Sequence, residues 1–96
     1  MKAKISEIVQ GVEGDIKALE ELKKQLEDQK KTLDTERIKK TSMLENEREL
    51  NEDAAEMSRL EKNIHELDGE ISALEETLRT ISVILEKLQV VVHRAL

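Results

Sequence analysis

The second half of the chain carries the pattern that most restricts its fold. Between Met57 and Val92, apolar residues recur at alternating spacings of three and four without interruption. These residues are Met57, Leu60, Ile64, Leu67, Ile71, Leu74, Leu78, Ile81, Leu85, Leu88 and Val92. This is a sustained heptad repeat with apolar a and d positions, starting with Met57 at a. It predicts a long helix that pairs with another helix in a coiled coil.

The first half of the chain repeats the heptad less cleanly. Its a row is apolar as far as residue 33 and comprises Ile5, Val12, Leu19, Leu26 and Leu33. Its d row mixes the apolar Ile8, Leu22 and Met43 with the polar Asp15, Gln29 and Glu36. Leu33 and Met57 are 24 residues apart, three more than three heptads, so the two halves do not share one register.

Composition points to an all-α protein with a narrow core. Among the 96 residues, 40% are charged, and Phe, Trp, Tyr, Pro and Cys are all absent. A compact core without aromatic residues would lose much of its usual buried area, whereas a coiled coil needs only an aliphatic stripe. The regular spacing of the apolar residues argues against disorder. We predict a single coiled-coil domain over residues 1–96.

Charge and hydropathy limit the range of partners. The net charge of −6 argues against nucleic acid as the main partner. No stretch approaches the roughly 20 apolar residues that a membrane-spanning helix requires. The absence of Cys excludes disulfides and thiolate metal sites. From these features we expect an intracellular, cytoplasmic protein.

Antiparallel pairing of the two halves follows from testing the alternatives. Parallel self-pairing would stack Asp15 on Asp15 in the core, which is costly for like charges. Pairing residues whose numbers sum to 93 places apolar a positions of the first half opposite apolar d positions of the second. The predicted layers are Ile5/Leu88, Ile8/Leu85, Val12/Ile81, Leu19/Leu74, Leu22/Ile71, Leu26/Leu67 and Leu33/Leu60.

The charged e positions give the same orientation. Lys23, Lys30 and Arg37 occupy e in the first half. Glu61, Asp68 and Glu75 occupy e in the second half. Because e positions flank e positions in an antiparallel pair, three cations would face three anions and set the orientation.

The pairing could form within one chain or between two. We favour a helical hairpin with arms at about residues 3–41 and 51–95, and the alternative is a pair of straight helices in an antiparallel homodimer. Ser42-Met43-Leu44-Glu45 fits a capping box and Asn51 fits an N-cap, which supports a break. The lack of Gly or Pro between residues 44 and 50 favours a straight helix.

An excess of aliphatic residues near both termini suggests the function. Two helices cannot bury all of them, so another helical surface should cover this end, where we expect Val9 to lie next to Ile84. The candidate partner-binding residues are Ile5, Ile8, Val9, Val12, Ile16, Ile81, Ile84, Leu85, Leu88, Val91 and Val92. We predict an assembly module that binds itself or a helical protein, and as an alternative a regulatory adaptor that captures a client helix.

Enzymatic chemistry finds no support in the sequence. His65 and His93 both lie away from the predicted seam, and only Glu61 is placed to join His65 in binding a metal. The paired carboxylates, such as Glu20 and Glu21, would need a concave pocket to separate their pKa values. We expect no catalytic residue, cofactor or metal site.

Overall fold

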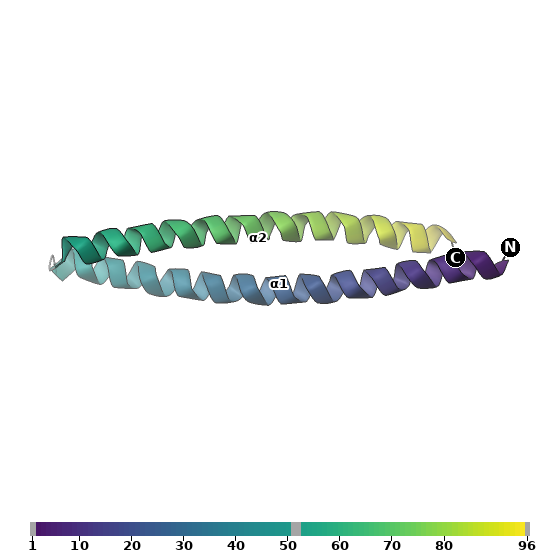
Figure 1. The fold of residues 1–96 in the computed structure, drawn as a ribbon, viewed down its shortest axis with the longest axis horizontal. Coiled ribbons are helices and arrows are strands. Elements are labelled where there is room, and N and C mark those ends of the chain that lie inside the picture. Colours follow the sequence, from purple (N-terminus) through teal and green to yellow (C-terminus); the bar gives the residue numbers. More distant parts are fainter. Residues whose placement is uncertain (1, 51–52, 96) are drawn as a thin grey trace. The chain divides into compact units, whose positions relative to one another are not determined.

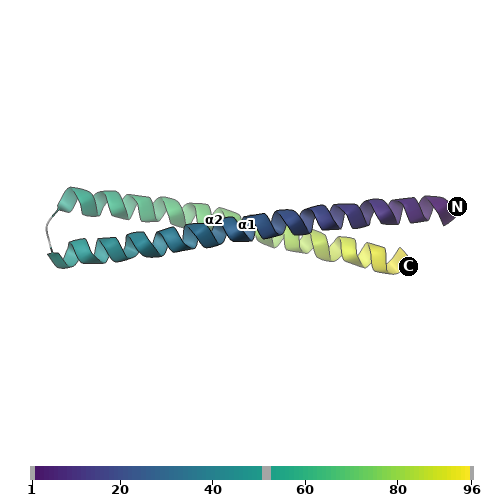
Figure 2. The ribbon, with the colours of Figure 1, turned by 90° about the horizontal axis from the view of Figure 1, so that it is seen from below.

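The chain is an all-α helical hairpin, as the sequence predicts. The computed structural model describes residues 2–50 and 53–95, and the side chains of residues 4–50 and 53–95. Helix α1 spans Lys2–Leu50 and helix α2 spans Ala54–Ala95. Figures 1 and 2 show the two helices, with α1 coloured from purple to teal and α2 from green to yellow.

The hairpin consists of two compact units. The first combines Met1–Glu27 with Glu76–Leu96 and is called the open-end unit here, because it contains both termini. The second comprises Asp28–Glu75 and is called the loop-end unit. Each unit pairs a segment of α1 with a segment of α2.

Helix α1 is longer than the first predicted arm. It ends at Leu50 rather than near residue 41, and Ser42 lies within it instead of starting a capping box. The segment Glu45–Leu50 consists of strong helix formers apart from Asn46, and Leu44 is buried. Propensity and burial together therefore outweigh the weak capping signal.

Asp53 starts helix α2. Its Oδ1 accepts hydrogen bonds from the backbone N–H groups of Ala55 at 3.0 Å and Glu56 at 3.2 Å. The carbonyl of Asp53 accepts a bond from the N–H of Met57 at 3.1 Å. This is the geometry of an N-cap residue. The cap predicted at Asn51 lies outside the described residues.

The predicted seam of α2 is confirmed in full. Each of the a and d residues from Met57 to Val92 is buried or half-buried. Leu60, Leu67 and Ile71 are among the buried residues of the loop-end unit, and Ile81 and Leu85 are those of the open-end unit. Both rows of α2 are apolar throughout, so they specify the face of the helix that packs against α1.

The seam of α1 differs from the prediction in one of its two rows. The a row is half-buried from Val12 onward, as predicted, but the second row is e and not d. The residues of this e row are Val9, Ile16, Lys23, Lys30, Arg37 and Leu44, all half-buried or buried. Ile8, Leu22 and Met43 of the predicted d row are exposed. The long aliphatic stems of Lys and Arg pack along the seam while their charged ends reach water.

The predicted register is also wrong. Lys30 pairs with Glu75 and Arg37 pairs with Asp68, so the numbers of these partners sum to 105 rather than 93. In the open-end unit, Val12 and Val92 line one groove, and their numbers sum to 104. The predicted layers, such as Ile5/Leu88, therefore do not form. The extension of α1 to Leu50 moves the turn along the chain and shifts every layer with it.

Candidate docking site at the open end

Seven of the eleven predicted partner-binding residues belong to the interior of the open-end unit. Ile81 and Leu85 are buried between the two helices. The five half-buried residues are Val9, Val12, Ile16, Leu88 and Val92. These residues pack between the two helices, and Val9, Val12 and Val92 also line a groove at the end of the unit.

The other four predicted residues are exposed. The relative exposure is 52% for Ile5, 64% for Ile8, 41% for Ile84 and 51% for Val91. Leu22 is also exposed, at 42%, although the sequence pattern assigned it to the seam. Its exposure follows from the use of row e rather than row d by α1.

An apolar groove opens between the ends of α1 and α2. It has a volume of about 170 Å³ and is lined only by aliphatic side chains. The lining residues are Ile5, Ile8, Val9, Val12, Val91, Val92 and Ala95. A cavity of about 150 Å³ holds a benzene-sized group, so the groove accepts about one large apolar side chain. Val9 lies here with Val92 and Ala95, and not level with Ile84 as the predicted register required.

Exposed aliphatic residues of both helices lie on one side of the seam. Ile8 and Leu22 are two heptads apart on α1, and Ile84 and Val91 are one heptad apart on α2, so each pair shares a row. Ile8 and Val91 line the same groove, which places the two rows on the same side. We call Ile8, Leu22, Ile84 and Val91 the apolar flank.

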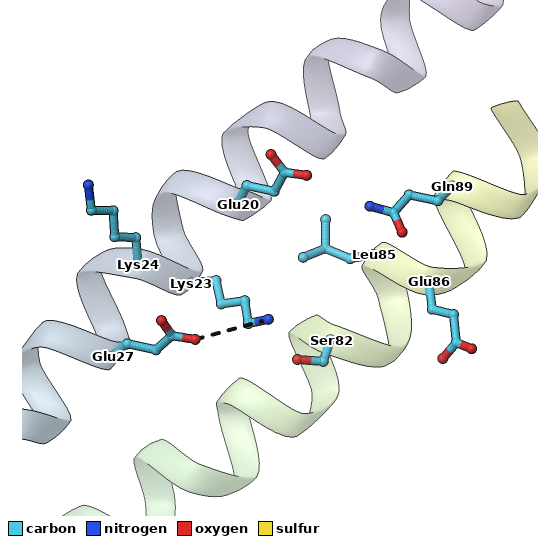
Figure 3. A pocket seen from close by; sticks show the side chains of 8 residues that line it. All are labelled: Glu20, Lys23, Lys24, Glu27, Ser82, Leu85, Glu86 and Gln89. Carbon is cyan, nitrogen blue, oxygen red and sulfur yellow. Dashed lines mark ion pairs between the residues drawn. The ribbon is translucent and has the colours of Figure 1, made fainter.

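The open-end unit also has a polar pocket, which Figure 3 shows at close range. Its lining residues are Glu20, Lys23, Lys24, Glu27, Ser82, Leu85, Glu86 and Gln89. Lys23 Nζ lies 4.0 Å from Glu27 Oε1 on its own helix, and Leu85 is the one apolar residue of the lining. Figure 3 shows Lys24 pointing away from α2. The charged side chains of this pocket are of both signs and largely solvent-exposed. A site of this kind offers little binding energy for a small ligand.

Cross-helix ion pairs lie in the loop-end unit. Lys30 Nζ is 3.4 Å from Glu75 Oε1, and Arg37 is paired with Asp68. The hydrogen bond with Asp68 raises the pKa of Arg37 above its ordinary value, and the charge of Asp68 adds to this effect. Two of the three predicted cations thus face predicted anions on α2.

The remaining predicted charges have other partners. Lys23 pairs with Glu27 of α1 rather than with a residue of α2. Glu61 pairs with Arg48 at 3.0 Å, a contact that the sequence analysis missed. Arg48 lies beyond the predicted end of the first arm, so the prediction did not include it among the paired charges. In the structure it belongs to α1, which reaches Leu50.

Neither a metal-binding cluster nor a membrane-spanning helix is found among the described residues. No group of three or more His, Asp or Glu side chains within residues 2–50 and 53–95 is placed to bind a metal ion. Neither of the two helices, over the same residues, is long and apolar enough to cross a membrane. The apolar flank and its groove, with their exposed aliphatic residues, are the candidate functional surface.

Comparison of the chain with protein-family models, curated proteins and solved structures finds no match.

Proposed function

We propose that the chain is an assembly module whose open-end unit docks an α-helical protein surface through the apolar flank and the adjoining groove. One observation carries this proposal. Of the ten large hydrophobic residues that are exposed among those described, seven belong to the open-end unit. These seven are Ile5, Ile8, Leu22, Val83, Ile84, Val90 and Val91.

The interior of the open-end unit is correspondingly thin. Among its described residues, only Ile81 and Leu85 are buried, whereas Leu44, Leu60, Leu67 and Ile71 are buried in the loop-end unit. A unit that leaves several large aliphatic residues exposed has apolar surface that a partner could cover.

The spacing of the flank fits a helical partner. Residues repeated at seven-residue intervals, as Ile84 and Val91 are, form a straight row along a helix. Such a row packs against the complementary row of another helix, and the groove beside it can receive one inserted side chain. An amphipathic helix laid along an apolar groove is a common mode of protein recognition.

The available driving force suits a reversible association. Completing the burial of four half-exposed aliphatic side chains contributes roughly 3 to 6 kcal/mol. Apolar residues of the partner contribute a comparable amount. The sum is similar in size to the association cost of about 4 to 15 kcal/mol, so we expect binding of moderate affinity.

The proposal is tested by replacing Ile84 with Asp. This change should leave the helical circular dichroism intact while it reduces the sedimentation coefficient of any oligomer. If the wild-type chain is monomeric, the open flank should bind a hydrophobic fluorescent dye, as an adaptor for a client helix would, and Ile84→Asp should weaken that binding.

Ile38→Asp provides the matched control. Ile38 is 64% exposed but lies in the loop-end unit, away from the flank. It should change neither association nor dye binding. If Ile84→Asp and Ile38→Asp behaved alike, the apolar flank would have no special role and the proposal would be rejected.

A further inference from the structure

We infer that the partner of the apolar flank is a second copy of the chain, and that Asp15 of one copy pairs with Lys87 of the partner subunit. This inference rests on the proposed function and specifies its partner. It follows from three properties of the hairpin, namely its exposed area, the charges within the flank and the register of its helices.

The exposed area is large enough for a dimer. The chain exposes 7510 Å², although a compact folded monomer of 11.0 kDa would expose about 5,600 Å². The difference exceeds the roughly 800 Å² that each partner buries in an interface of standard size. The hairpin as a whole therefore exposes enough surface for an interface of standard size.

Each helix carries a charge next to the exposed apolar residues of the flank, and the two charges have opposite sign. On α1, Asp15 lies midway between Ile8 and Leu22 in the same heptad row. On α2, Lys87 lies between Ile84 and Val91 and is one turn from each. Among the described ion pairs of the hairpin, none involves Asp15 or Lys87. The surface is therefore complementary to itself, as a two-fold interface requires.

The register brings these charges together when α1 of one copy packs on α2 of the other. In the open-end unit, Val12 and Val92 line one groove and their numbers sum to 104, so we take residues with similar sums to lie near the same level. Asp15 is therefore level with a position about two residues from Lys87, and Leu22 is level with a position about two residues from Ile84. Both offsets are within the reach of a side chain.

Rotation about a two-fold axis parallel to the helices does not change the position of any residue along the helix direction. Residues that are level within one copy are therefore also level between copies. The rotation places the two open-end units side by side and sets α1 of each copy antiparallel to α2 of its partner. The result is four helices in which every neighbouring pair is antiparallel, the arrangement of an up-down-up-down bundle. The Asp15–Lys87 contact then occurs twice. The flank residues Leu22 and Ile84 also meet twice.

Charge exchange tests the inference on the full chain. Sedimentation velocity at low salt should show that Asp15→Lys and Lys87→Asp each raise the dimer dissociation constant about tenfold. The double variant Asp15→Lys with Lys87→Asp should recover most of the wild-type affinity. High salt should reduce all of these differences.

Glu20→Lys and Lys24→Asp are the matched controls. They make the same changes of charge at the polar pocket of the open-end unit, away from the flank (Figure 3). They should leave the dissociation constant within about twofold of wild type.

The outcomes separate this inference from the proposed function. A monomeric wild-type chain that binds dye through Ile84 would overturn the second copy and leave the docking function standing. Loss of the dimer in Ile84→Asp without rescue by the double charge exchange would overturn the Asp15–Lys87 arrangement alone. No effect of Ile84→Asp on either association or dye binding would overturn both.

Discussion

Among the described residues, Glu47 has a buried carboxylate oxygen, Oε2, without a hydrogen-bond partner. The residue occupies the a row of α1 within the loop-end unit, where it is half-buried. A buried acceptor without a partner loses its hydration and gains nothing in return. Glu47 is therefore a local weakness in the packing between α1 and α2.

Replacing Glu47 with Leu should stabilise the protein. The change removes the unpaired oxygen and extends the aliphatic seam, so the free energy of unfolding should rise by about 1 to 3 kcal/mol. Urea unfolding followed by circular dichroism measures this directly. Glu49→Leu, at an exposed position of the same helix, is the control and should change little. A loss of stability in Glu47→Leu would show that the carboxylate has a compensating partner.

At the scale of the helices, α2 was predictable and α1 only in part. Both rows of α2 are aliphatic, so its a and d positions specify one packed face. In α1, the second packed row contains Lys23, Lys30 and Arg37. A hydrophobicity pattern assigns such charged residues to positions beside the seam and not within it. Their stems are apolar enough to pack, which periodicity alone does not reveal. The hydrophobicity pattern therefore assigns row d, which includes Leu22, to the seam.

The turn was misplaced for a related reason. Capping signals near residues 42 and 51 suggested that the first arm ends early, whereas α1 continues to Leu50. Once the turn is misplaced, every layer moves with it. The choice of paired charges was more robust than the register, because Lys30 and Arg37 still meet anions of the predicted set. Ile8, Ile84 and Val91 of the flank were among the predicted partner-binding residues, because the surplus of aliphatic side chains near the termini does not depend on register; Leu22 was not among them.

The pair Arg37–Asp68 fixes the observed register of the loop-end unit, and its reversal is a test of that register. Arg37→Glu should lower the free energy of unfolding at low salt, and only modestly because the pair is partly exposed to solvent. Arg37→Glu with Asp68→Arg should recover most of the loss. Because the raised pKa of Arg37 lies far above neutral pH, the cation should contribute equally throughout the neutral range.

Lys23 supplies the contrast for this experiment. The predicted register placed it beside an anion of α2, but it pairs with Glu27 on its own helix. Lys23→Glu should therefore gain no rescue from Glu75→Lys in urea unfolding. Rescue at Lys23 together with none at Arg37 would favour the register predicted from the sequence over the observed one.

At the scale of the whole molecule, the two units differ in how they satisfy their apolar residues. Counted over the side chains that the structure describes, the loop-end unit buries four large hydrophobic residues and exposes three, and it has cross-helix ion pairs at Lys30, Arg37 and Arg48. On the same count, the open-end unit buries two and exposes seven. Stability that depends on a partner should therefore reside mainly in the open-end unit, and assembly and folding should be coupled there.

This coupling predicts that thermal stability depends on protein concentration. Each tenfold rise in concentration favours a dimer by about 1.4 kcal/mol, or about 0.7 kcal/mol for each chain. For a chain of this size, that corresponds to a rise in Tm of roughly 3 to 6 °C per tenfold increase. Circular dichroism melting at several concentrations measures the slope.

Ile84→Asp should abolish the slope and converge on the wild-type Tm at low concentration, because only the dimer gains from mass action. Ile38→Asp should retain the slope. A wild-type Tm that did not change with concentration would mean that the hairpin folds without a second copy. The partner of its exposed aliphatic residues would then be a different protein.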